Sequence, residues 1–173
     1  MTSDFESLAE KINQLAERIR IPDFDTFPDI ELYMDQVLDF ITRSRTSLRR
    51  DDKLSSAMVN NYIKAELLPR ARGKKYSREH LAHLAVIMRL KHVLSVKDTG
   101  TLIALNKDDK SDRQFYEDFQ KMVANGAKEI ADKILSSDSS YQDLAMQLAV
   151  SSYLNKIACE HIIDTLTGEA EDY

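Results

Sequence analysis

One short segment, residues 56–66, carries side chains suited to hydrogen bonding with the edges of nucleic-acid bases. At the 100° per residue of a helix, its polar side chains gather within a sector of about 140°, and they are Ser56, Asn60, Asn61 and Lys64. An Asn amide can pair with adenine through two hydrogen bonds, and Ser and Lys can contact phosphates or bases. Because Asn is a mediocre helix former, two adjacent Asn favour a binding role over an ordinary exposed helix face.

A basic turn follows this segment directly. Five cations fall within nine residues, and they are Arg70, Arg72, Lys74, Lys75 and Arg78. Cations at this density repel one another unless an anion is close. The release of counterions from a phosphate backbone favours the binding of each such cation. Residues 43–92 carry 13 Lys/Arg and 4 Asp/Glu, a net charge of +9, whereas the rest of the chain carries −14. This asymmetry predicts a polyanion-binding region in an acidic protein, with a chance cluster on a solvated face as the alternative.

Other reactive side chains give weaker patterns. His80 and His83 lie three residues apart on an expected helix, but a metal site needs more ligands nearby, so helix-start and packing roles are favoured. Cys159 and His161 point to different helix faces, and a lone Cys in an apolar helix is usually a core residue rather than a thiol sensor. The chain has no nucleophile motif, Gly-rich phosphate loop or His-Glu-x-x-His pattern. We therefore expect no catalytic residues, no metal and no cofactor.

Helices are expected to position these groups. Only 4 Gly and 3 Pro occur among 173 residues, so the chain has few helix breakers. Pro69 ends the helix that begins at Ser56, Gly73 marks a bend, and Ser77 is suited to cap the next helix. The expected elements are a linker over 22–28, a helix over 29–43, a polar and basic loop over 42–53, a helix over 56–66, a turn over 70–76, a helix over 77–94 and a brief helix over 96–105.

Further helical patterns lie on both sides of this region. A capping box at Ser3–Glu6 starts an N-terminal helix whose apolar positions repeat every three or four residues, namely Phe5, Leu8, Ile12, Leu15 and Ile19. After a charged linker over 106–110, two long helical patterns cover about 115–134 and 144–162, separated by a Ser-rich break over 136–140. The second is apolar around much of its circumference, so we expect it to be largely buried.

Composition limits the class of protein. Hydrophobic residues make up 43% of the chain, which is ordinary for a folded protein and too rich for disorder. No apolar run approaches the roughly 20 residues that a membrane-spanning helix needs, and the N-terminus lacks the pattern of a signal peptide. A single cysteine fits a reducing compartment. These features predict a cytoplasmic protein without a membrane segment.

The order of motifs in the middle of the chain resembles that of the MerR family. In that family a recognition helix ends in Leu-Leu-Pro and is followed by a wing, a Tyr-Thr/Ser pair and an apolar helix. Here the corresponding motifs are Leu67-Leu68-Pro69, the turn Arg70–Tyr76, Tyr76-Ser77, the run Leu81–Ile87 and the helix start Ser95–Asp98. The resemblance implies a winged helix-turn-helix that binds DNA as a dimer.

The resemblance also assigns Tyr62 to one of the family's paired tyrosines, which touch phosphate. The sequence departs from the family pattern at three places. Asn60 and Asn61 stand where the family has Arg and the other Tyr, Glu66 replaces a Gly, and residues 43–53 resemble an insertion. The family's base contacts therefore do not transfer residue by residue.

A closer resemblance is to an uncharacterised bacterial family defined only as a domain of unknown function. The shared motifs are Asp35-Gln36-Val37, Asn60-Asn61-Tyr62, Leu67-Leu68-Pro69 and the run Lys74–Leu81. This resemblance implies a bacterial origin and a regulatory role, and it indicates no ligand.

Together these patterns predict an all-α fold with a small β-hairpin wing and a helical C-terminal region. The expected divisions are an N-terminal helix and linker (1–27), a MerR-like winged helix-turn-helix (28–106), a helical dimerisation or regulatory region (107–167) and an acidic tail (168–173). The expected groove contacts are Ser56, Asn60, Asn61 and Lys64, and the expected phosphate contacts are Arg49, Arg50, Tyr62, Arg70, Arg72, Lys74 and Lys75.

The predicted function is that of a non-enzymatic, homodimeric transcriptional regulator of repressor type that binds double-stranded DNA sequence-specifically. A protein-interaction module on a winged-helix scaffold is the alternative, because winged helices also serve as docking surfaces and the acidic remainder suits a basic partner. Whether the C-terminal helices enclose a small-molecule effector stays open, since an apolar ligand pocket, a plain core and a dimer interface have the same sequence pattern.

Overall fold

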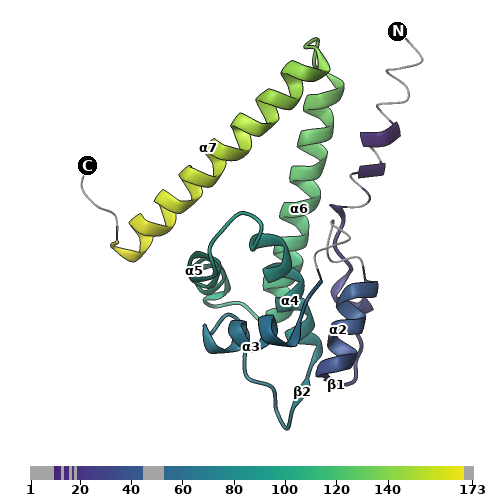
Figure 1. The fold of residues 1–173 in the computed structure, drawn as a ribbon, viewed down its shortest axis with the longest axis vertical. Coiled ribbons are helices and arrows are strands. Elements are labelled where there is room, and N and C mark those ends of the chain that lie inside the picture. Colours follow the sequence, from purple (N-terminus) through teal and green to yellow (C-terminus); the bar gives the residue numbers. More distant parts are fainter. Residues whose placement is uncertain (1–9, 13, 16, 18, 45–52, 170–173) are drawn as a thin grey trace.

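The computed structural model describes residues 10–169 except 13, 16, 18 and 45–52. Helices dominate this part of the chain, and its sheet joins two short antiparallel strands (Figure 1), which confirms the predicted all-α class with a small β-hairpin. The elements in chain order are η1 (Phe24–Thr26), β1 (Leu32–Tyr33), α2 (Met34–Arg43), α3 (Ser56–Lys64), β2 (Lys75–Tyr76), α4 (Arg78–Leu90), α5 (Val96–Lys107), α6 (Asp112–Leu135) and α7 (Tyr141–Thr167).

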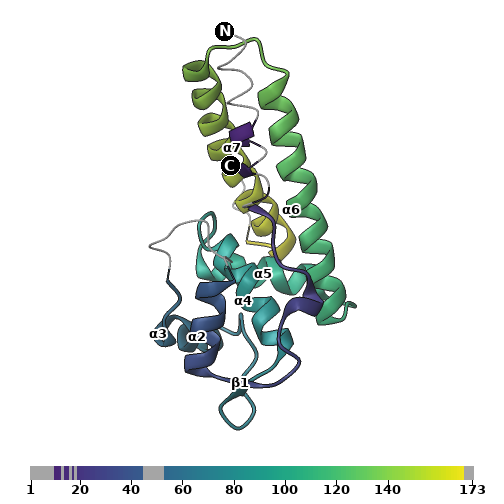
Figure 2. The same cartoon turned by 90° about the vertical axis from the view of Figure 1, so that its right-hand side faces the viewer.

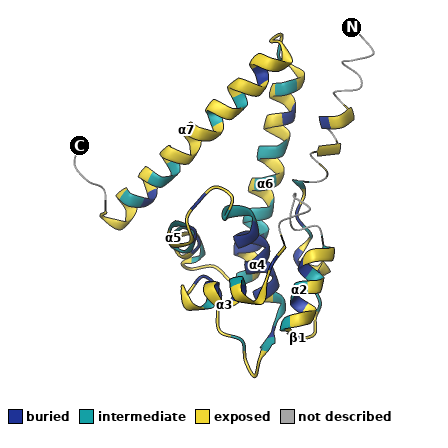
Figure 3. Ribbon diagram, in the orientation of Figure 1, coloured by how far each residue is buried: buried dark blue, intermediate teal, exposed yellow. Residues whose placement is uncertain are grey.

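Helix α4 lies at the centre of the fold. Every residue from His80 to Met88 is buried, which covers more than two helical turns and therefore all sides of the helix. The first half of α6 packs along α4, while α2 and β2 also pack against it. Figure 3 shows α4 as a dark-blue ribbon enclosed by its neighbours. The sequence motif that resembles a post-wing helix is thus the core around which the other elements assemble.

The predicted helix over 29–43 is wrong in its first turn. Residues Leu32 and Tyr33 form strand β1, which pairs with Tyr76 and Lys75 of β2, and α2 begins only at Met34. This pairing buries Leu32 and Tyr76 together in the core. It leaves Ile30, in the first turn of the predicted helix, 68% exposed. A long-range strand pair therefore outweighs the local helical pattern.

The expected linker over 22–28 is part of the core. Phe27 is buried between Tyr116 of α6 and Phe40 of α2, with ring centroids 5.3 Å and 5.9 Å away. The Tyr116 hydroxyl donates a hydrogen bond of 2.8 Å to the Pro22 carbonyl. Phe24 packs against both Phe27 and Tyr116. The segment therefore ties α2 to α6 through an aromatic cluster.

Helix α6 rises from the compact lower part, and α7 returns downward from its upper end at a wide angle, so the two helices form a V-shaped arm (Figures 1 and 2). The Ser-rich break over 136–140 separates them as predicted, and Ser140 caps α7 by accepting from the Asp143 N–H. The expectation that α7 is largely buried is wrong for the single chain. Among the described residues of α7, only Leu144 and Ile163 are buried, because α7 diverges from α6 along its length.

Helix α3 ends in a motif that requires a left-handed residue. The Leu67 N–H donates to the Tyr62 carbonyl (2.9 Å) and the Glu66 N–H donates to the Ile63 carbonyl (3.2 Å), which is the Schellman pattern. Glu66 occupies its left-handed position, with φ of 59°. Glycine is the usual residue there because a Cβ atom in this conformation costs about 1–2 kcal/mol. The sequence motif at which Glu replaces Gly is therefore a strained helix end.

Replacing Glu66 with Gly should relieve this strain. We expect Glu66→Gly to raise the free energy of unfolding by about 1 kcal/mol, after allowing for the greater entropy of Gly in the unfolded chain. Equilibrium urea denaturation measures the change, with Glu66→Ala as a control that removes the carboxylate and keeps the Cβ. A Gly variant no more stable than the Ala variant would contradict this account.

Candidate nucleic-acid interface

Helix α3 presents its polar side outward. Val59 and Tyr62 are buried in the main core and anchor the inner side of the helix. Ser55 caps the N-terminus by accepting from the Met58 N–H at 3.2 Å, and α3 packs against α2. The exposed residues of α3 include Ser56, Asn60, Asn61 and Lys64, the four predicted groove contacts. We call this set the α3 face.

The basic turn is a tight hairpin. Arg72 and Lys75 exchange two backbone hydrogen bonds of 3.2 and 3.0 Å across a two-residue loop of Gly73 and Lys74. Both loop residues have positive φ, 57° and 65°, which defines a type I′ turn. Gly tolerates this conformation freely, whereas Lys74 adopts it at a cost in strain. Lys74 lies at the tip of the hairpin and is exposed to solvent.

Like Lys128 and Lys133 of α6, the cations of this hairpin contact no carboxylate in the described part of the chain, whereas many other cations are paired. Arg43, Arg113 and Lys107, on other elements, each contact a carboxylate of the chain. Within the described part of the chain, no ion pair joins a carboxylate to Lys64, Arg70, Arg72 or Lys74. We call Arg70, Arg72, Lys74 and Lys75 the hairpin cations. They are available to an external anion.

The α3 face and the hairpin lie at the same end of the molecule. In Figures 1 and 2 both occur in the lower part, opposite the turn that joins α6 to α7. The hairpin projects furthest, and α3 lies beside its base. The β1–β2 pairing fixes the hairpin to α2, against which α3 also packs. The helix and the hairpin are therefore both attached to α2 and β1.

The remaining predicted contacts are Arg49, Arg50 and Tyr62. Arg49 and Arg50 lie outside the described residues. Tyr62 is only 4% exposed, because it lies on the inner side of α3 among core residues, so its ring offers no open surface to a phosphate. Sequence reasoning missed Tyr33, which is exposed on β1 with the Lys75 ammonium 5.7 Å from its ring centroid. Only the unpredicted strand pairing places Tyr33 beside the hairpin.

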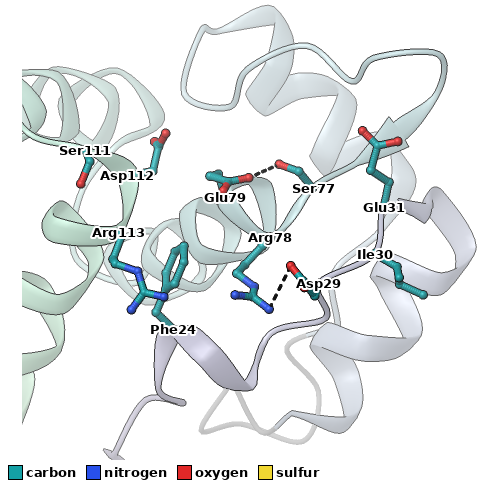
Figure 4. Close-up of a pocket in the computed structure, with 10 residues that line it drawn as sticks. All are labelled: Phe24, Asp29, Ile30, Glu31, Ser77, Arg78, Glu79, Ser111, Asp112 and Arg113. Atoms are coloured by element: carbon teal, nitrogen blue, oxygen red, sulfur yellow. Dashed lines mark hydrogen bonds and ion pairs between the residues drawn. The ribbon is translucent and has the colours of Figure 1, made fainter.

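A hollow of about 510 Å³ lies on another side, between the linker and the first residues of α4 and α6 (Figure 4). Phe24 lies between the guanidinium groups of Arg78 and Arg113, 5.8 and 4.7 Å from its ring centroid. Arg78 contacts Asp29 at 3.4 Å, and Arg113 contacts Asp25. Hydrogen bonding to Arg113 lowers the pKa of Asp25. The two arginines of this hollow are paired with aspartates of the same chain, and these pairs connect the linker to α4 and α6. The hollow is therefore not suited to bind an anion.

The two histidines of α4 are buried and have structural roles. His80 Nδ1 accepts from the Ser77 backbone N–H at 3.1 Å, which caps the helix start. His83 Nε2 lies 2.7 Å from Asp112 Oδ1, an oxygen that Lys107 also contacts at 2.7 Å. His83 is 3% exposed, and burial lowers its pKa despite the carboxylate. In the described residues no cluster of His, Cys, Asp and Glu is suited to hold a metal ion.

Cys159 is half-buried on α7, and burial raises the pKa of its thiol. A raised pKa reduces the thiolate population and hence the reactivity of the residue. No helix among the described residues combines the length and the hydropathy needed to cross a membrane.

The buried His83 predicts acid sensitivity of the fold. A base whose pKa is lower in the folded than in the unfolded chain binds fewer protons when folded, so stability falls as the pH drops below about 6.5, the unfolded value. We expect the urea midpoint to be lower at pH 5.5 than at pH 7.5. In His83→Gln, whose amide can still donate to Asp112, the loss of unfolding free energy between pH 7.5 and pH 5.5 should be smaller than in the wild type. Equal pH dependence in both proteins would contradict this role of His83.

Comparison with known proteins gives one family. The profile of a family described as "Domain of unknown function (DUF1836)" matches residues 22–123. The match covers the linker, the α3 face, the hairpin, α4, α5 and the first half of α6. No curated protein and no solved structure matches the chain.

Proposed function

This chain belongs to the family described as "Domain of unknown function (DUF1836)", and we propose that it binds double-stranded DNA through the α3 face and the hairpin. In this proposal α2 and α3 form a helix-turn-helix resembling that of the MerR family, and the hairpin acts as its wing. The protein then regulates transcription, in keeping with the regulatory role implied by its sequence motifs.

The observation that carries the proposal is the set of unpaired cations beside an amide-rich helix face. Arg70, Arg72 and Lys74 are exposed and lack carboxylate partners within the described residues, in a chain with net charge −5 where acidic groups are plentiful. Phosphate groups along DNA supply the missing anions, and the release of counterions from DNA favours each contact. Unpaired cations alone give non-specific binding.

Specificity in this proposal comes from α3. A nine-residue helix is about 13.5 Å long, and the major groove of B-DNA is wide enough to admit it. Asn60 and Asn61 then face base edges, where an Asn amide reads adenine through two hydrogen bonds. Ser56 and Lys64 at the two ends of the helix contact the flanking backbone or bases. Tyr33 is a further candidate for phosphate contact, since it lies beside Lys75.

A protein-docking role is the competing function, because the remainder of the chain carries −14 outside residues 43–92. A mobility-shift assay separates the two, using a duplex from the region upstream of the protein's own gene at two salt concentrations. Retardation that weakens strongly at the higher salt supports DNA binding. Folded protein that gives no retardation at low salt overturns the proposal.

Lys74 offers a clean test because its charge can be removed without harming the hairpin. We expect Lys74→Gly to fold at least as stably as the wild type, since Gly adopts the positive φ at no cost. Its affinity for DNA of any sequence should decrease, and the slope of log K against log salt should become shallower by about 0.9, the loss of one phosphate contact. Fluorescence anisotropy with a labelled duplex across a salt series measures both effects.

Two variants serve as controls. Lys121→Gln removes an exposed cation on α6, far from the hairpin, and should leave the salt dependence unchanged. Asn60→Ala should preserve the slope and reduce the preference for the upstream duplex over a random one. If Lys74→Gly and Lys121→Gln bind DNA alike, the hairpin does not contact the phosphates.

A further inference from the structure

The outer side of α7 carries apolar side chains that nothing in the single chain covers. Its two buried residues, Leu144 and Ile163, lie near the two ends of the helix, where α7 meets the α6–α7 turn and α5. Apart from Ile162, which lies in the same helical direction as Leu144 and is also exposed, five large apolar side chains between them are exposed, namely Met146, Val150, Tyr153, Leu154 and Ile157. In Figure 3 most of this helix is drawn as exposed.

These five residues form one continuous stripe. Their spacing of four, three, one and three residues places them within a sector of about 100°, opposite the direction of Leu144 and Ile163. Met146 is 66% exposed and Tyr153 is 64% exposed. A long helix gains most of its stability in a protein from packing of an apolar face. The stripe therefore has the pattern of a helix-packing surface without a partner in its own chain.

The stripe also lacks charge. The twelve residues from 144 to 155 contain no Asp, Glu, Lys or Arg, whereas such side chains dominate ordinary solvated helix faces. Charged residues return at both ends, with Asp143 before this run and Lys156, Glu160 and Asp164 after it. An interface of this kind has an apolar centre and a polar rim.

We propose that the outer stripe of α7 binds the same stripe of a second copy of this chain, with the two helices antiparallel. An isologous contact requires a surface that is complementary to itself. An uncharged apolar stripe meets this requirement, because it places no carboxylate against its own symmetry mate in a chain of net charge −5. Tyr and Met are also enriched at protein interfaces.

The surface area of the stripe is consistent with a contact to a second copy of the chain. Each large apolar side chain offers on the order of 100 Å² of surface, so two copies that each contribute five such residues bury about 1,000 Å² in total. This area reaches the lower range of specific protein interfaces. Burial of neighbouring small residues of α7 adds to it.

Self-association through α7 would complete the proposed function, on which this consequence rests. A dimer presents two α3 faces related by a two-fold axis, which suits an inverted-repeat DNA site. The contact itself does not depend on DNA. It can therefore be tested on the protein alone.

Light scattering coupled to size exclusion, performed on the full chain without DNA, measures the mass directly. We expect wild-type protein at about 50 μM to show twice the 19.8 kDa chain mass. Val150→Glu and Tyr153→Glu should each reduce the mass to that of one chain, because they place a carboxylate against its symmetry mate. Met122→Glu is the matched control, since Met122 is 57% exposed on α6 outside the stripe, and it should remain dimeric.

Each outcome decides the proposal. Wild-type protein that stays monomeric overturns it and assigns the stripe to a different partner. A dimer that survives both α7 substitutions overturns it as well, and so does a dimer lost equally in Met122→Glu. If a Glu variant fails to fold by circular dichroism, Val150→Ser replaces it and must increase the dissociation constant of the dimer at least tenfold. Failure of DNA binding would leave these results unchanged.

Discussion

The burial of α4 on every side is the constraint on which the rest of the structure depends. A helix with nine consecutive buried residues must be enclosed, and the enclosing elements are thereby fixed relative to one another. α6 covers one side, and α2 and the strand pair cover others. Because α4 also contains His80 and His83, their polar atoms need partners at its rim. Ser77 and Asp112, at the first turns of α4 and α6, supply a partner for one ring nitrogen of each histidine, whereas His80 Nε2 and His83 Nδ1 are buried without one.

This arrangement anchors the candidate interface to the core although the interface contains a strained turn. Tyr76 belongs to the same core as α4 and pairs with Leu32, so the base of the hairpin is anchored while its tip projects. The end of α3 is held by the Schellman bonds and by Leu67 and Leu68, both buried. Among the described residues, Glu66 and Lys74 are the non-glycine residues with positive φ, and they lie at the end of α3 and at the tip of the hairpin. This strain therefore lies in and beside the candidate interface, and core packing nearby offsets it.

Local signals in the sequence predict most of the helices. Serines at the helix starts, Pro69 and the Ser-rich break give boundaries close to those of α3 through α7, and helical periodicity places Tyr62 on the inner side of α3, where it lies. The phosphate role of Tyr62 came from a family resemblance, and burial argues against it. Strand β1 could not be predicted, because two residues have no periodicity and their partners lie 44 and 42 residues later in the chain. The exposure of α7 was missed because an apolar helix has the same pattern whether its partner is its own chain or another one.

The central claim is that the α3 face and the hairpin contact DNA while the α6–α7 arm does not. Hydrogen–deuterium exchange of the full chain, with and without a random-sequence duplex at low salt, tests it most directly. The account predicts slower exchange in peptides covering 56–66 and 70–76 and no change in peptides from the middle of α7. Protection confined to α6 or α7, or no protection anywhere under conditions in which the duplex is bound, would contradict it.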